Sequence, residues 1–86
     1  MTVDVFVTIT SYDTLYDPNE LSASVVQSIK DYINGLTTGS TVYVVGIANA
    51  VHDTDGIIDF QVTNPISNQL VLSTQKPVAG NIIVSI

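Results

Sequence analysis

The first residues of the chain alternate between apolar and polar side chains, and this pattern limits the possible folds more than any other feature. The stretch "VDVFVTIT" at residues 3–10 places an aliphatic side chain at every second position: Val3, Val5, Val7 and Ile9. The positions between and after them form the other face: Asp4, Phe6, Thr8 and Thr10. A period of two predicts a strand with one buried face. Another part of the chain must therefore cover that face.

A helical period follows. The stretch "YDPNE" contains the signals of a helix start, with Asp17 as the N-cap, Pro18 at the first helical position and Glu20 as the capping-box partner. Apolar residues then recur at every fourth position and form one stripe: Leu21, Val25, Ile29 and Ile33, joined by Val26 and Tyr32. We expect this helix to run to about Asn34, with Gly35 as its C′ residue.

The second half of the chain combines both periods. We expect a short extended segment near Val42 and Tyr43, and then a helix from Val44 to Val51. After Gly56 the strand period returns, because Ile58, Phe60 and Val62 alternate with polar residues. Two further apolar runs, "QLVLST" and "NIIVSI", predict two more strands, and the Pro and Gly of "QKPVAG" mark the turn between them.

These elements predict an α+β fold of one domain spanning residues 1–86. Two helices pack on one face of a small, mostly antiparallel sheet, in the order β-α-α-β-β-β. The face that carries the threonines of residues 3–10 is then left for solvent or for a neighbouring protein. An open sheet also has edges, and the run "NIIVSI" carries no charge that would protect it as an edge strand.

The charge balance excludes several classes of partner. Lys30 and Lys76 are the only basic residues, and the formal net charge is -6. Because no basic patch is available to neutralise phosphates, we expect neither nucleic acid nor an anionic membrane as a partner. No apolar run approaches the roughly 20 residues that span a bilayer. Charged residues make up only 12% of the chain. A neutral polar surface of this kind suits permanent packing against other protein.

The stretch "HDTDG" holds the only histidine and is the first candidate for a site. His52 with Asp53 and Asp55 provides part of a metal site, but the chain has no second nitrogen or sulfur ligand of the kind that zinc or non-haem iron prefers. The same stretch resembles the start of a calcium loop, yet Val62 stands where the closing glutamate belongs. The simpler interpretation is a solvated joint in which Gly56 turns the chain from helix to strand.

Catalytic and sugar-binding sites are weaker candidates. His52 would have to serve as the base of a hydrolytic triad, and no G-x-S-x-G stretch is present. Asp53 with Asp59 is a conceivable acid pair for glycoside cleavage, although acids at a turn and a strand start are usually only solvated. Four tyrosines are candidates for a sugar platform: Tyr12, Tyr16, Tyr32 and Tyr43. We expect no catalytic residue, no metal, no cofactor and no small-molecule substrate.

The stretch from "YDPNELSASVVQSIKDYING" to "VHDTDGIIDFQV" resembles the C-terminal region of baseplate J-like proteins, which occur in contractile-tailed phages and related injection systems. The resemblance lies in a helix of the type "V..SI.DYIN.L", a "G..V" turn, a short helix and a "GI.DF.V" strand. The matching positions are Val25, Ile29, Tyr32, Ile33, Leu36, Gly39, Val42, Ile47, Val51, Gly56, Ile57, Asp59 and Phe60. Family members are longer, so this chain resembles either one domain of such a protein or a short relative.

The resemblance implies a structural role and no enzymatic activity. Baseplate J-like proteins form the wedge and inner ring of the baseplate, and they transmit the rearrangement that triggers sheath contraction. The partners implied are other baseplate subunits, in a homo- or hetero-oligomeric ring when the protein is full length. The implied location is the virion tail baseplate, assembled in the cytoplasm of the bacterial host. The implied source is a phage or a prophage. The alternative is a receptor-binding or carbohydrate-binding module of a phage or cell-surface protein.

Overall fold

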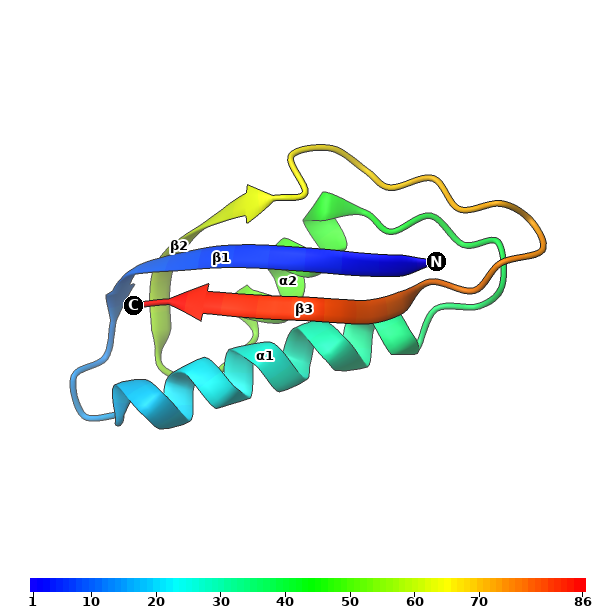
Figure 1. The fold of residues 1–86 in the computed structure, drawn as a ribbon. Helices are drawn as coiled ribbons and strands as arrows, with labels where there is room; N and C mark the ends of the chain where they lie inside the picture. Colours follow the sequence, from blue (N-terminus) through cyan, green and yellow to red (C-terminus); the bar gives the residue numbers. More distant parts are fainter.

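The fold is described by a computed structural model that covers residues 1–86 and contains two helices and a three-stranded sheet (Figure 1). In chain order the elements are β1 (Thr2–Tyr12), α1 (Pro18–Asn34), α2 (Val44–His52), β2 (Ile57–Asn64) and β3 (Val78–Ser85). The predicted α+β class and both predicted helices are confirmed. The first strand, the strand after Gly56 and the last strand also form, with ends that differ from the prediction by a few residues.

The sheet is mixed, so the prediction of a mostly antiparallel sheet is wrong. β1 lies in the centre, β2 pairs with it antiparallel, and β3 pairs with it parallel. The direction of β3 follows from where β2 ends. Asn64 lies opposite Phe6 in the first half of β1, and the N–H of Val78 donates to the carbonyl of Met1 at 2.8 Å. The chain therefore crosses the first end of β1 and returns along its other side in the same direction as β1.

The crossing segment replaces a predicted strand. Residues 65–77, which we call the arch, contain no regular strand, so the prediction of a strand at "QLVLST" is wrong. Within the arch only Gln69 forms a strand-like bridge, which is to Val42, with hydrogen bonds of 2.8 and 2.9 Å. The N–H of Gly39 also donates to the carbonyl of Gln75 at 2.7 Å. The partner of the arch is thus the loop between α1 and α2, which contains no regular strand.

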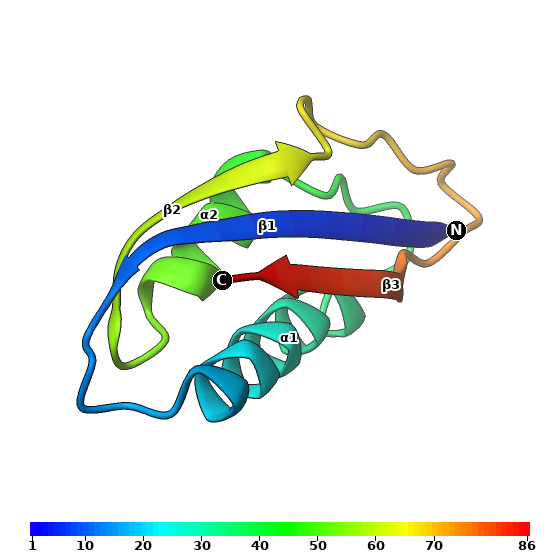
Figure 2. The same ribbon diagram turned by 60° about the vertical axis from the view of Figure 1, so that its left-hand side comes forward.

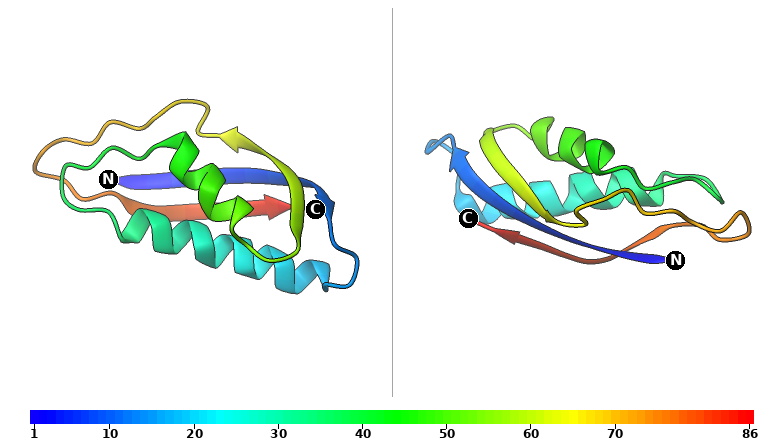
Figure 3. Two further views of the ribbon diagram at one scale, coloured as in Figure 1. Left: turned by 180° about the vertical axis from the view of Figure 1, so that it is seen from behind. Right: turned by 90° about the horizontal axis from the view of Figure 1, so that it is seen from above.

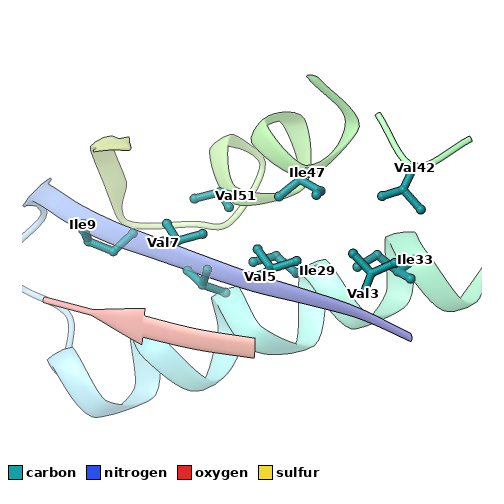
Figure 4. Packing of buried hydrophobic residues seen from close by; sticks show 10 residues of the cluster. Val3, Val5, Val7, Ile9, Ile29, Ile33, Val42, Ile47 and Val51 are labelled. Carbon is teal, nitrogen blue, oxygen red and sulfur yellow. The ribbon is translucent and has the colours of Figure 1, made fainter. Parts of the chain in front are cut away.

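Both helices cover the same face of the sheet (Figure 3). The buried aliphatic face of β1 points toward them, as predicted, and the two helices supply the other side of the core (Figure 4). The core cluster contains Val3, Val5, Val7, Ile9, Val25, Ile29, Ile33, Val42, Ile47 and Val51. Fully burying one such side chain contributes about 2 kcal/mol to the free energy of unfolding. The core is therefore formed by β1, α1, α2 and one residue of the loop before α2.

The helix ends differ in part from the prediction. Asp17 caps α1 by accepting a hydrogen bond from the N–H of Asn19 at 2.8 Å, while Glu20 does not form the second half of a capping box. Gly35 ends α1 in the right-handed region, at φ -79, and therefore not as a left-handed C′ residue. Its N–H still donates to carbonyls of the last turn. The capping geometry is set by these short contacts, which a sequence pattern does not contain.

Candidate functional site

The "HDTDG" stretch is an exposed joint between α2 and β2. His52 is the last residue of α2, and Gly56 adopts φ 90, a left-handed conformation that favours glycine. The Nδ1 of His52 lies 3.7 Å from Oδ1 of Asp53, and their side chains are 77% and 81% exposed. An ion pair at this exposure contributes little to stability. The geometry agrees with the interpretation of this stretch as a solvated turn.

Thr54 is the one buried polar residue of the joint. Its hydroxyl lies 3.0 Å from the carbonyl oxygen of Ala50 and 3.1 Å from the hydroxyl of Ser28 on α1. Because Ser28 belongs to another helix, this contact fixes the joint against α1. Burial of a threonine is tolerated when its hydroxyl has partners. Thr54 therefore has a structural role, which the sequence pattern did not indicate.

The joint does not bring metal ligands together. No group of three or more histidine and acidic side chains is placed so that it could hold a metal ion. Val62, at the position that closes a calcium loop, lies half-buried within β2. A carboxylate is needed at that position to complete the loop. The residues His52, Asp53 and Asp55 thus remain near each other in sequence without forming a coordination shell.

A cleft of about 430 Å³ lies between the joint and α1. It is lined by Tyr16, Glu20, Leu21, Ser24, Ser28, Asp53, Thr54 and Asp55. His52 does not line it, so the serines of the cleft have no histidine base beside them. Asp59 does not line it either, and its Oδ1 accepts a hydrogen bond from the N–H of Phe60 at 2.9 Å. The candidate pairs of a hydrolase are therefore not assembled in this cleft.

The tyrosines do not form a sugar platform. Tyr16 is the only tyrosine of the first cleft, and the second cleft, of about 260 Å³ beside Thr2 and Pro65, contains none. Tyr32 and Tyr43 do meet, because the hydroxyl of Tyr32 accepts from the N–H of Tyr43 at 3.2 Å. The ring of Tyr32 also fills the space beside Gly46, where a Cβ would overlap with it. Tyr32 thus joins the two helices.

The sheet face opposite the helices is uncovered, and we call it the open face (Figure 2). Its residues on β1 are the ones predicted to face away from the core, and the register places their β3 neighbours beside them. The open face includes Thr2, Asp4, Phe6, Thr8, Thr10, Val78, Ile83 and Ser85. Phe6 lies opposite Ile83, and both are exposed. On β1 and β3 the open face is therefore partly apolar, with Asp4 as the one charge of these two strands.

A second exposed apolar group lies on the arch. Leu70 and Leu72 are 80% and 68% exposed, and Ile66 is also exposed. The arch nevertheless supports the helices, because Oδ1 of Asn68 accepts from the N–H of Val44 at 3.0 Å. Tyr43, the N-cap of α2, provides no side-chain cap of its own. Sequence reasoning missed this cap because Asn68 is distant in sequence and becomes a neighbour only after folding.

The architecture therefore leaves the open face and the apolar residues of the arch exposed as surfaces. No helix combines the length and the apolar character that a membrane crossing requires. Residues 3–85 match the family model described as the baseplate J-like protein C-terminal domain. A search of the curated proteins found no match. Baseplate J-like proteins are structural phage components, and the family is not a known enzyme family. The resemblance seen in the sequence is thereby confirmed, and the chain belongs to the baseplate J-like protein C-terminal domain family.

Proposed function

We propose that residues 1–86 act as one structural domain in the wedge or inner ring of a contractile-tail baseplate. The domain works by protein burial, with its surfaces packed against neighbouring subunits of a homo- or hetero-oligomeric ring. The family match over residues 3–85 is the observation that carries this proposal. Its location is the virion tail, and we infer that assembly takes place in the bacterial host cytoplasm.

The uncovered surfaces of the sheet support this mechanism. The open face presents Phe6 and Ile83 together, and its remaining residues are mostly threonine and serine. Such residues lose less solvation energy than charged residues do when another protein covers them. A specific contact needs about 800 Å² on each partner. The carbohydrate-binding alternative is not favoured by any observation, since neither cleft contains two tyrosines.

Removal of the domain from its own genome tests the proposal. We expect that deleting the codons for residues 1–86 produces tails that lack a complete baseplate, as seen by negative-stain electron microscopy. Neighbouring genes for sheath, tube and spike proteins are the expected genomic setting. A matched control carries Thr38→Ala in the exposed loop between α1 and α2, away from the open face, and is expected to assemble normally. Complete baseplates without the domain, or neighbouring genes unrelated to a tail, would contradict the proposal.

A further inference from the structure

The outer edge of β3 is an unpaired strand edge. The N–H of Val78 donates inward to Met1, and the N–H of the next residue, Ala79, donates outward to Oδ1 of Asn34 at 2.9 Å. Further along, Ile82 and Val84 lie opposite Val5 and Val7. In each bridge pair of a parallel ladder, the backbone groups of only one of the two residues point toward the partner strand. In the pairs of Val5 with Ile82 and Val7 with Val84, we infer that this residue is the valine of β1. The N–H groups of Ile82 and Val84 then point away from β1, to the side where no strand follows.

The two edges of the sheet are protected differently. On the β2 side the pairing with β1 has three register irregularities, and Asp59 adds a charge within the strand. Bulges and charges are common ways to prevent a further strand from pairing with an edge. On the other side β3 contains no charged residue over its 8 residues, and its pairing with β1 has one register irregularity, between Val3 and Val5. Side chains accept hydrogen bonds from two N–H groups of β3, those of Ala79 and Asn81. The second half of β3, from Ile82 on, has neither a charge nor such a cap, and it is the part of the edge that is open to a partner strand.

One side of α1 runs along this edge. Ser28 and Tyr32 face α2, as their hydrogen bonds to Thr54 and Tyr43 demonstrate. Asn34 faces the outer edge of β3. Residues four apart share one side of a helix, so the stripe that leads to Asn34 lies along the edge as well: Ser22, Val26, Lys30 and Asn34. We call this stripe the α1 shelf. Figure 2 shows α1 running alongside β3, so a strand added at the outer edge of β3 would lie next to this shelf.

The charge on the shelf selects the partner. Lys30 has no ion-pair partner, since the only ion pair of the protein joins His52 and Asp53. A second copy that paired through its own β3 would bring no acid to Lys30, because β3 has none. An acidic segment of a different protein complements Lys30 and avoids the loss of leaving it unpaired.

We propose that the outer edge of β3 binds an extended segment of a partner protein as a fourth strand, with an acidic side chain of that segment beside Lys30. Backbone hydrogen bonds to Ile82 and Val84 provide the affinity, and contacts between the α1 shelf and the side chains on one face of the segment provide the specificity. This inference rests on the proposed function only for the statement that the partner is another protein of the tail.

Two designed peptides test the inference. Each has the length of β3, 8 residues, and alternates valine with threonine. One peptide carries a central glutamate and the other a central lysine. Binding to the isotope-labelled protein is followed by amide chemical shifts and by hydrogen exchange. We expect shifts at Ile82, Val84 and Lys30, slower exchange at Ile82 and Val84, and about tenfold tighter binding of the glutamate peptide, which corresponds to one favourable charge contact.

Variants of the protein separate the backbone edge from the side chains. Val84→Pro removes the outward N–H, and an edge strand tolerates a proline at such a position. This variant should weaken binding about tenfold, because one backbone hydrogen bond to the peptide is lost. Val84→Ala keeps the N–H and is the matched control, expected to bind as the unchanged protein does. Lys30→Glu should reverse the preference in favour of the lysine peptide. This reversal tests the inference even if Val84→Pro does not fold.

Several results would overturn the inference. They are no binding of either peptide, equal affinity for both, shifts confined to β2, or concentration-dependent self-association through β3 without peptide. The last result would identify a second copy as the occupant. The baseplate deletion experiment is independent of these measurements. If the deletion leaves tails without baseplates while the peptides do not bind, the inference about β3 fails and the proposed function stands.

Discussion

β1 and the arch both contain apolar residues that predict a strand, yet they differ in what surrounds them. β1 has a strand on each side and a helix layer over its apolar face. The arch has one bridge, between Gln69 and Val42, and its leucines at 70 and 72 point into solvent. The difference teaches that an apolar run forms a strand only where another strand is available to pair with it. It also divides the molecule into a stable core and a peripheral segment.

The largest expected effect comes from the core side of this comparison. Ile29→Ala removes a fully buried side chain from the centre of the cluster beneath β1. We expect the free energy of unfolding to fall by about 3 kcal/mol, from lost apolar burial and from the cavity left behind. Urea unfolding followed by circular dichroism measures this change. Ile58→Ala, at an exposed position of β2, is the control. A similar small loss in both variants would contradict the assignment of the core.

An intermediate effect is expected where the arch contacts the helices. Asn68→Ala removes the side chain that caps α2 at Val44. We expect a loss of about 1 kcal/mol, which is typical for a helix cap. Ser67→Ala changes the neighbouring exposed residue of the arch and should have almost no effect. If the two variants unfold at the same urea concentration, the arch does not support α2 in the way described here.

The smallest effect is expected at the exposed side chains of the arch. Leu72→Ser replaces an apolar side chain that is 68% exposed and has little burial to lose. We expect the free energy of unfolding to change by no more than about 0.5 kcal/mol. Thermal unfolding of the variant beside the unchanged protein measures this. A loss comparable to that of Ile29→Ala would mean that the arch packs as a true core element, and the distinction from β1 would disappear.

Much of the fold was predictable because local patterns decide it. The alternation at residues 3–10, the four-residue apolar period after Asp17 and the glycine at position 56 each determine a nearby conformation. The family was predictable for the same reason, since its recurring residues are those of packing and turns. The exposed placement of His52 also agrees with the interpretation of "HDTDG" as a joint.

The remainder depends on contacts between distant segments. The direction of β3 is set by the route of the arch past the start of β1, and no residue within β3 encodes that route. The caps provided by Asn34 to Ala79 and by Asn68 to Val44 join residues that are 45 and 24 positions apart. The sequence indicates the uncapped part of the β3 edge only through the absence of charge in "NIIVSI". The position of Lys30 beside this edge depends on how α1 packs against the sheet.

The parallel pairing of β1 and β3 also determines how the domain responds to mechanical load. The two strands run side by side in one direction, and the chain ends lie at opposite ends of the pair (Figure 1). A force that pulls Thr2 and Ser85 apart drags the strands past each other along their length. The bonds across a ladder run between the strands, so such a force loads them together and does not open them one after another. Residues 1–86 therefore resist stretching along the strands as a shear joint.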